Sequence, residues 1–310
     1  MGKTAYIFPG QGSQSVGMGK DLFDSFESAK TVFAEADEAL GFEISDLCFG
    51  GTDEDLALTE NTQPAILTAS VAAYKSFRSE GGPKPDFVAG HSLGEYSALV
   101  AAGALTLTDA AKTVRNRGTY MQEAVPVGVG AMAAILGLDS ETVTDICAKA
   151  AEGEVCSPAN INSPKQTVIA GHVAAVERAC ELLKDAGARR TVMLNVSAPF
   201  HCALMMPAQE RLAADLDLIE FGDLDFPLAE NVSACLNTEA ERVATALTEQ
   251  VSSPVRWLEI VENLIKEGAD RFVEIGPGKV LSGLVRQISR DVAYFNVTDQ
   301  ESLRNTLNNL

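Results

Sequence analysis

The residues best placed to do chemistry form the pentapeptide GHSLG at residues 90–94, which has the pattern G-x-S-x-G. In this pattern the serine lies on a tight turn between a strand and a helix, with its hydroxyl exposed as a nucleophile. The flanking segments agree, since residues 86–89 predict a short buried strand and residues 95–102 a helix. The pattern therefore predicts that Ser92 is a catalytic nucleophile. The alternative is a glycine-rich turn whose serine only caps a helix.

A serine hydroxyl is a weak nucleophile and needs a base within hydrogen-bonding distance. The chain has three histidines: His91, His172 and His201. His91 directly precedes the serine, so its side chain should leave the turn in another direction, and His172 lies at the start of a predicted helix. His201 lies at a junction between two stretches with different patterns of predicted strands and helices, where a cleft between domains would form. His201 is therefore the predicted base. The alternative is a structural histidine whose ring is buried and hydrogen-bonded in the core.

Two further segments could complete a site. A strand predicted over residues 4–8 runs into a glycine-rich turn at residues 9–14, which lacks both the third glycine of a dinucleotide loop and a Lys-Ser/Thr pair. These missing features disfavour a loop that binds nucleotide phosphates. The alternative is a loop whose backbone N–H groups face a site. In a helix predicted over residues 108–124, Arg117 and Met121 share one face. Arg117 is then either a surface arginine along apolar neighbours or a carboxylate clamp at the edge of an apolar pocket.

The elements that must position these residues fall into two groups. Strands at residues 4–8, 86–89 and 272–275 and long helices belong to one α/β unit. From about residue 126 the expected order becomes β-α-β-β-α-β, which is typical of a ferredoxin-like domain. Its helix at residues 173–186 is expected to pack on the sheet through Val176, Cys180, Leu182 and Leu183. We therefore predict a large domain at 1–125 and 197–310 with a small ferredoxin-like domain at 126–196.

The composition limits the possible functions. The chain has 310 residues, 46% of them hydrophobic, which is enough for a full hydrophobic core. Its net charge of -19 argues against nucleic acid as the main partner. No apolar run approaches the ~18 residues of a membrane span, so no membrane association is expected. The six cysteines are scattered without a C-x-x-C pair, which disfavours a zinc site and a disulfide framework and favours reduced thiols in the cytoplasm.

Several segments along nearly the whole chain resemble the malonyl-CoA:acyl carrier protein transacylases of fatty-acid synthesis and the related acyltransferase domains of polyketide synthases. These segments are FPGQGSQ at 8–14, GHSLGEY at 90–96, NINSP at 160–164, Pro199-Phe200-His201, Gln250 before SPV at 253–255, and EIGPG at 274–278. The resemblance implies an α/β-hydrolase-like large domain with the ferredoxin-like domain over its site. The site would lie in the cleft between the two domains.

The resemblance also implies roles for the site residues. The backbone carbonyl of Gln250 would orient His201 in place of a triad carboxylate, although a helix-end glutamine is the alternative. Backbone N–H groups of Gln11 and Leu93 would form the oxyanion hole, and Arg117 would bind the free carboxylate of a malonyl group. Other candidate substrate-binding residues are Met121, Met132, Asn160, Asn162 and Phe200. The alternative for the methionines and Phe200 is core packing, and for the asparagines it is turn formation.

The resemblance implies ping-pong transfer of malonyl from coenzyme A to the phosphopantetheine thiol of an acyl carrier protein. A monomer that needs no metal or redox cofactor is expected. A chain without flanking domains favours fatty-acid synthesis over a polyketide pathway. The alternatives are a serine thioesterase or other hydrolase, in which water replaces the second thiol, a trans-acting polyketide acyltransferase, and a carrier-binding scaffold without turnover.

Overall fold

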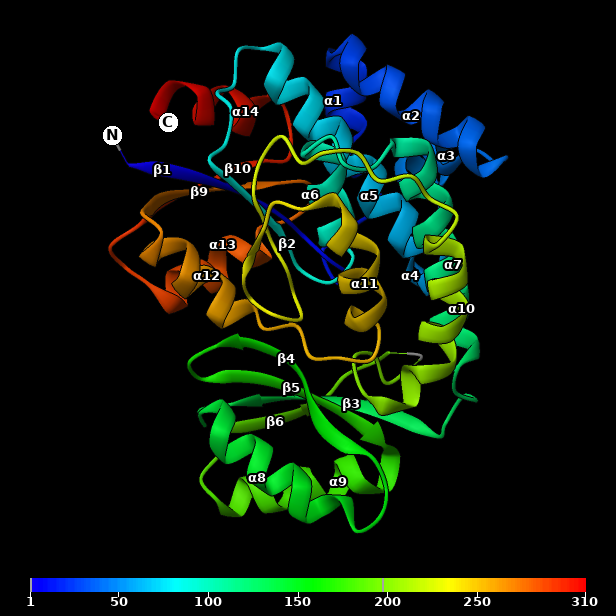
Figure 1. Cartoon of the computed structure of the whole chain (residues 1–310), viewed down its shortest axis with the longest axis vertical. Helices are drawn as coiled ribbons and strands as arrows, with labels where there is room; N and C mark the ends of the chain where they lie inside the picture. The colour runs from blue at the N-terminus through cyan, green and yellow to red at the C-terminus, as the bar shows by residue number, and fades with distance from the viewer. Residues whose placement is uncertain (1, 197) are drawn as a thin grey trace.

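A computed structural model describes residues 2–196 and 198–310, and two sheets organise it (Figure 1). The first is a six-stranded sheet in the order β10-β9-β1-β2-β7-β8. Its strands are β1 (Lys3–Phe8), β2 (Phe87–Gly90), β7 (Leu228–Ala229), β8 (Leu236–Asn237), β9 (Ala269–Ile275) and β10 (Ala293–Val297). All recorded pairings are parallel except that of β7 with β8. The carboxyl ends of β1 and β2 therefore meet at one edge, where open α/β sheets bind their ligands.

Both faces of this sheet are covered, which explains why β1 and β2 are buried on both faces. Along β1, Tyr6 and Phe8 pack into one cluster and Ala5 and Ile7 into another, as the alternation of a strand requires. The second cluster is closed by α12 (Trp257–Lys266) and α13 (Val280–Ile288). The helices of the first cluster are α1 (Lys20–Ser25), α2 (Glu27–Leu40), α3 (Ile44–Gly50), α4 (Asp53–Ala57), α5 (Thr59–Ser79), α6 (Gly94–Ala101), α7 (Leu107–Glu123), α10 (Met206–Leu216), α11 (Ala240–Gln250) and α14 (Gln300–Asn309).

A four-stranded antiparallel sheet forms the second unit, in the order β4-β5-β3-β6. Its elements are β3 (Gly130–Leu136), α8 (Ser140–Ala151), β4 (Cys156–Ser163), β5 (Gln166–His172), α9 (Val173–Asp185) and β6 (Arg190–Met193). This order and connectivity are those of the predicted ferredoxin-like domain, and all its strands fall within residues 126–196. The predicted upper boundary of that domain adjoins Ser197, which lies outside the described residues.

The small sheet lies between its own helices and the large domain (Figure 1). Ala133 and Ile135 of β3 face α8 and α9, whereas Met132 belongs to the main core of the large domain. Strand β4 also extends across the boundary, because the Ile161 N–H donates to the Val255 carbonyl at 2.9 Å. The two units therefore share both a core and backbone hydrogen bonds, which fixes the cleft between them.

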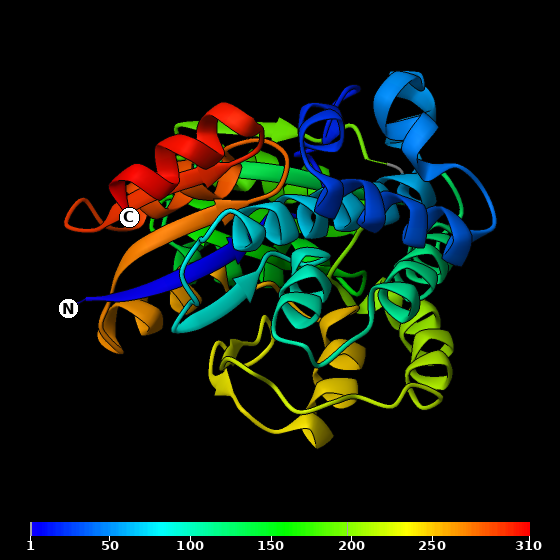
Figure 2. The same cartoon turned by 90° about the horizontal axis from the view of Figure 1, so that it is seen from above.

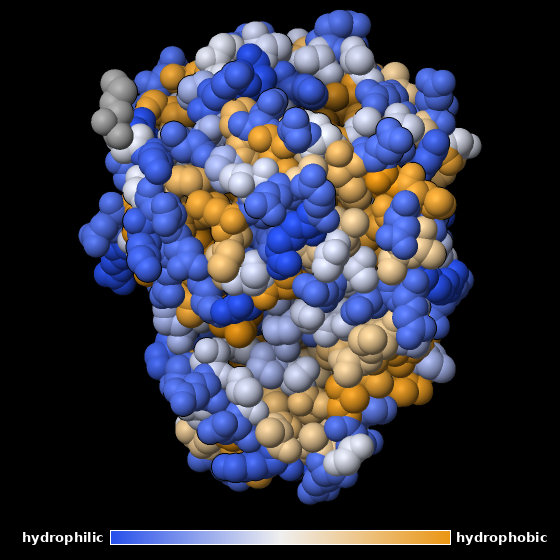
Figure 3. All heavy atoms as spheres, viewed as in Figure 1, coloured by the Kyte–Doolittle hydropathy of each residue, from blue (hydrophilic) through white to orange (hydrophobic). Residues whose placement is uncertain are grey.

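The ends of the chain lie on the same side of the molecule in two perpendicular views (Figures 1 and 2). Arg271 of β9 explains this closeness, because its guanidinium donates to the carbonyls of Gly2 and Leu310 at 2.6 and 3.0 Å. On the face shown in Figure 3, hydrophobic side chains gather in small patches that hydrophilic ones separate. No described helix has the length and apolar character needed to cross a membrane.

One helix of the large domain has a proline in its interior, and one detail of the predicted small-domain packing is wrong. Helix α5 begins at Thr59, so Pro64 lies inside it. Proline cannot donate to the Glu60 carbonyl one turn earlier, and Arg115 of α7 donates to that carbonyl instead, at 2.9 Å. Leu182 of α9 is 43% exposed rather than packed on the sheet. At 3.6 residues per turn it lies about 120° away from Val176 around the helix.

Candidate active site

The pentapeptide at residues 90–94 forms a sharp turn between β2 and α6, as predicted. Ser92 has a φ of 52°, in the left-handed region that only a constrained site imposes on a residue other than glycine. A Cβ on Gly90 would lie 1.9 Å from the Gly94 carbonyl carbon, and a Cβ on Gly94 would lie 2.1 Å from the Phe8 carbonyl oxygen. Glycine is therefore required at both positions, because strand, turn and helix approach one another too closely for any side chain.

The nucleophile and base predicted from the sequence lie in direct contact. Ser92 Oγ is 2.7 Å from His201 Nε2, and His201 Nδ1 is 2.9 Å from the backbone oxygen of Gln250. Because a carbonyl oxygen only accepts, the ring proton lies on Nδ1 and leaves Nε2 to accept from the serine hydroxyl. His201 is itself in the left-handed region, at φ 60°. The arrangement suits proton abstraction from Ser92, with a backbone carbonyl where a triad has a carboxylate.

Burial determines the protonation state of this base. His201 is 3% exposed. Burial, and then the positive charge of Arg117, lower the pKa of the His201 imidazole to about 3, against hydrogen bonds to the Gln250 and Ser253 backbone that raise it. The imidazole is therefore neutral at neutral pH, which is the form that a general base requires.

Arg117 of α7 lies deeper than the expected pocket edge. Its side chain is 2% exposed, and Nη2 donates to Ser92 Oγ at 3.1 Å and to Gln250 Oε1 at 2.8 Å. Nη1 donates to Gln63 Oε1 at 2.7 Å, whereas Nε finds no partner among the described residues. The guanidinium carbon also lies 5.7 Å from the centre of the Tyr96 ring. A cation is thus held against the nucleophile rather than at the pocket rim.

The predicted oxyanion donors, Gln11 and Leu93, lie in the turns that follow β1 and β2. Phe8 pairs with Gly90 across the two strands, so the turn at residues 9–14 lies against the serine turn. A Cβ on Gly10 would lie 2.4 Å from the His91 carbonyl oxygen, which shows how closely they approach. Within the described ranges, no protein acceptor is recorded for the backbone N–H of Gln11 or Leu93. These two N–H groups are therefore free to bind an oxygen at Ser92.

A cavity of about 680 Å³ opens over Ser92 between the two domains. Most of the predicted substrate-binding residues line it: Arg117, Met121, Met132, Asn160 and Phe200. Gln11 and the predicted nucleophile and base, Ser92 and His201, line it as well. Its size suits an acyl group with part of its carrier arm.

Asn162 is not among the residues that line this cavity, and its side chain contacts His91 instead. Asn162 Oδ1 lies 2.9 Å from His91 Nε2, and the His91 ring packs 5.6 Å from the Trp257 ring. Among the described residues, the hydrogen bonds recorded for Ser92 Oγ are with His201 and Arg117, and none is with His91. His172 is remote from the site, since its Nδ1 accepts from the Val155 N–H within the small domain at 2.9 Å.

Three polar residues of the site were missed by sequence reasoning: Gln63, Glu95 and Asn231. Gln63 binds Arg117, and its Nε2 also donates to Met121 Sδ at 3.8 Å. Asn231 Oδ1 accepts from the Ser92 N–H, and its Nδ2 donates to the Gly90 carbonyl, both at 2.7 Å. Only Glu95 carried a sequence signal, as the single charged residue in the apolar helix GEYSALVA.

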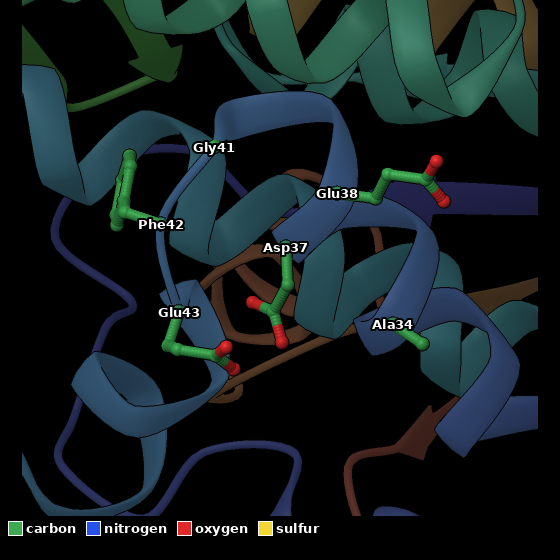
Figure 4. Close-up of a pocket in the computed structure, with 6 residues that line it drawn as sticks. All are labelled: Ala34, Asp37, Glu38, Gly41, Phe42 and Glu43. Atoms are coloured by element: carbon green, nitrogen blue, oxygen red, sulfur yellow. The ribbon is translucent and has the colours of Figure 1, made fainter.

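A second hollow, of about 370 Å³, lies where α2 ends and α3 begins (Figure 4). Its lining includes Asp37, Glu38 and Glu43. Asp37 is already occupied, because it accepts from the Ser45 N–H and hydroxyl at 3.0 and 2.6 Å and so fixes the start of α3. The residues that line this hollow include no serine, cysteine, lysine or histidine, and among the described residues no metal-binding group of three or more His, Cys, Asp or Glu side chains was found.

The chain is similar to known proteins along almost its whole length. Residues 5–302 match the model of the acyl transferase domain. The chain is 52% identical over 304 residues to the malonyl CoA-acyl carrier protein transacylase of Bacillus subtilis (strain 168), covering 98% of this chain and 96% of the relative. It is 49% identical over 288 residues to that of Escherichia coli (strain K12), covering 93% of each.

Two solved structures show the same fold. The malonyl CoA-acyl carrier protein transacylase of Coxiella burnetii superposes with a TM-score of 0.98 at 43% identity, over 100% of this chain and 98% of that one. A malonyl-transacylase in complex with a type II PKS acyl-carrier protein superposes with a TM-score of 0.97 at 47% identity, over 99% and 100% of the two chains. The predicted α/β-hydrolase-like fold with an inserted small domain is confirmed.

Proposed function

Because the chain belongs to the acyl transferase family, as its match over residues 5–302 shows, we infer that it transfers malonyl from malonyl-CoA to an acyl carrier protein. The malonyl group would be held as an ester on Ser92 and passed to the phosphopantetheine thiol of the carrier, which supplies malonyl units for fatty-acid synthesis. Relatives named malonyl CoA-acyl carrier protein transacylase, 52% and 49% identical, support this substrate pair.

The observation that carries this proposal is the position of Arg117. The Arg117 side chain is 2% exposed, and its Nη2 lies only 3.1 Å from Ser92 Oγ. A fixed positive charge therefore lies beside the predicted nucleophile. No carboxylate within the described ranges forms an ion pair with it. Burying a charge without a counterion costs several kcal/mol. An acyl group that ends in a carboxylate, such as malonyl, would provide that counterion.

In the first half-reaction His201 Nε2 takes the proton of the Ser92 hydroxyl as Oγ attacks the thioester carbonyl of malonyl-CoA. The oxyanion that forms is bound by the backbone N–H groups of Gln11 and Leu93. When it collapses, the carbon–sulfur bond breaks and the imidazolium returns its proton to the sulfur of coenzyme A. The products are coenzyme A and malonyl-Ser92.

In the second half-reaction the carrier thiol gives its proton to His201, and its sulfur attacks the ester carbonyl of malonyl-Ser92. The ester bond to Ser92 Oγ then breaks, and Oγ regains a proton from His201. We expect the bound carboxylate to strengthen this base, because it offsets the Arg117 charge that lowers the pKa of His201. Binding of the negatively charged malonyl group is thereby coupled to the pKa of the His201 imidazole.

We further propose that the enzyme acts in the cytoplasm as a monomer, without a metal or redox cofactor. The proposed steps use only a hydroxyl, an imidazole, a guanidinium and backbone N–H groups. One chain supplies the lining of the cavity from both of its domains, so the site needs no second copy. All six cysteines lie in the described part of the chain and are free, and five of them are buried, which suits a reducing compartment.

The Arg117→Ala variant should lose malonyl-CoA turnover by about two to three powers of ten, the effect expected when one partner of a buried charge pair is removed. Acetyl-CoA has no carboxylate and should lose little, so the preference for malonyl should narrow or invert. Arg117→Lys keeps the charge without the planar fork and should fall between. The measurement is the rate of Ser92 acylation with each thioester, followed by intact mass spectrometry.

Arg115→Ala is the matched control, because Arg115 lies on the same helix but donates to the Glu60 carbonyl and has no atom in the cavity. It should lower stability and leave the malonyl-to-acetyl ratio unchanged. If Arg117→Ala slows both acyl groups by the same factor, Arg117 does not bind the malonyl carboxylate and the proposal loses its main support.

A further inference from the structure

Glu95 has a buried carboxyl group that the reaction steps do not use. It lies in the first turn of α6, three residues after Ser92, and is 1% exposed. Its Oε2 accepts from Gln250 Nε2 at 2.7 Å and from the Asn231 N–H at 3.2 Å. Burial raises the pKa of this carboxyl to about 8; the hydrogen bonds from Gln250 and Asn231 and the charge of Arg117 act in the opposite direction, while Glu230 adds to the rise. A buried acid beside a nucleophile calls for a functional explanation.

The contacts of Gln250 show what this carboxyl group does. Because Oε2 accepts two hydrogen bonds, a proton on the group lies on Oε1 and leaves Oε2 as an acceptor. Gln250 Nε2 donates to Glu95 Oε2 and to the Ser92 carbonyl, whereas Gln250 Oε1 accepts from Arg117 Nη2. Turning the amide over would place its oxygen against two acceptors and its NH₂ against the guanidinium. Glu95 therefore permits only the orientation in which the amide oxygen faces Arg117.

The same carboxyl oxygen also reaches the serine turn. Asn231 donates its N–H to Glu95, and its side chain holds the Ser92 N–H and the Gly90 carbonyl. One oxygen of Glu95 thus connects the residue that supports the serine turn with the residue that supports the guanidinium.

The indirect connection leaves the place beside Arg117 open. A carboxyl group in direct contact with Arg117 would occupy the place that a substrate carboxylate needs. Glu95 instead lies one amide group away, with Gln250 between the two side chains. With a pKa of about 8 the Glu95 carboxyl is mostly protonated at pH 7, so it positions Gln250 through hydrogen bonds and leaves the Arg117 charge to be balanced by the substrate.

We propose that Glu95 is a positioning residue for malonyl selection: it fixes the Gln250 amide, and through it the Arg117 guanidinium, in the orientation that receives the malonyl carboxylate. Glu95 touches neither the substrate nor the reacting atoms. This inference rests on the proposed function, since it assumes that Arg117 binds malonyl. It predicts that Glu95 affects malonyl far more than acetyl.

The test compares Glu95→Leu with Glu95→Gln, using malonyl-CoA and acetyl-CoA as probes and the rate of Ser92 acylation as the readout. Leucine keeps most of the volume but removes the acceptor, so the malonyl-to-acetyl ratio should fall on the order of 30-fold. Glutamine can place its amide oxygen where Oε2 lies, so Glu95→Gln should keep the ratio within about threefold of the unchanged protein.

A double variant shows whether the effect passes through Gln250. In a Gln250→Leu background, adding Glu95→Leu should leave the malonyl-to-acetyl ratio unchanged, because the connecting amide is already absent. A further fall of the ratio in the double variant would contradict the proposed route.

Glu274→Gln is the matched control for burying an amide in place of an acid. Glu274 is also buried, and its oxygens accept from the Leu281 and Ser282 N–H groups at the start of α13. This variant should lower the melting temperature and leave the acyl ratio unchanged. Where Glu95→Leu does not fold, Glu95→Asp replaces it, because it withdraws the acceptor by one methylene, and the same loss of ratio is expected.

Two outcomes would overturn the inference: equal slowing of both acyl groups in Glu95→Leu, or a loss of ratio in Glu95→Gln as large as in Glu95→Leu. Failure of the proposed function is distinguishable from either one. It would appear in the unchanged protein, as absence of any malonyl adduct on Ser92.

Discussion

Replacing Ser92 by alanine should abolish the malonyl adduct and lower turnover on the order of 10⁶-fold, the loss seen when an activated serine nucleophile is removed. Ser92 Oγ is the hydroxyl that contacts both His201 Nε2 and Arg117 Nη2, at 2.7 and 3.1 Å. Alanine keeps the Cβ and changes little else in the turn, so the protein should remain folded. Intact mass spectrometry after mixing with malonyl-CoA, together with a thermal melt, checks both expectations.

Ser97→Ala is the matched control, because Ser97 lies on α6, the helix that follows the serine turn, is fully buried, and its hydroxyl has no recorded partner within the described ranges. Removing such a hydroxyl should leave acylation unchanged. A full-stoichiometry adduct on Ser92→Ala would place the nucleophile elsewhere.

Replacing His201 by alanine should slow Ser92 acylation by roughly 10²–10⁴, the contribution typical of a general base. The 2.7 Å contact with Ser92 Oγ gives the imidazole this role, and the Gln250 carbonyl fixes its tautomer. His172→Ala is the control, because the His172 ring binds the Val155 N–H in the small domain. A comparable loss in His172→Ala with none in His201→Ala would refute the assignment.

The pH dependence gives the same prediction a second readout. Burial and the Arg117 charge lower the pKa of His201 from 6.5 to about 3, so the imidazole stays neutral well below pH 6.5. The acid limb of the acylation rate should therefore lie below pH 6.5. The unfolded chain binds this proton first, so His201 should reduce the free energy of unfolding as the pH falls from 6.5 towards 3. An acid limb at or above pH 6.5 would contradict this environment.

The serine turn could be predicted because its causes are local. The crowding at Gly90 is local, because a Cβ there would meet the backbone of Gly94 and Glu95, whereas the crowding at Gly94 comes from the end of the neighbouring strand β1 at Phe8. The order of the small-domain elements was equally visible, since each strand and helix has its own periodicity. His201 could be predicted as a base and Arg117 as a carboxylate-binding residue, because their residue types suit these roles. The hydrogen bond of His201 to the Gln250 carbonyl came only from the family resemblance.

The supporting residues could not be predicted, because their contacts join distant segments. Asn231 binds the Ser92 N–H across 139 positions, and Gln63 binds Arg117 across 54. Neither contact leaves a pattern in the surrounding sequence. Strands β7 and β8 have two residues each, too few to show an alternation. The depth of Arg117 was misjudged because helical periodicity gives a face, and only tertiary packing decides what covers that face.

The measurement that tests transfer most directly starts from isolated malonyl-Ser92 enzyme, freed of malonyl-CoA and mixed with an equal amount of phosphopantetheinylated carrier. Intact masses of both proteins are followed over a single turnover, with a parallel sample that contains no carrier. The proposed function predicts that the malonyl mass leaves the enzyme and appears on the carrier thiol, while the parallel sample keeps its adduct. Release of free malonate at the same rate in both samples, with the carrier unmodified, would show that the chain is a hydrolase.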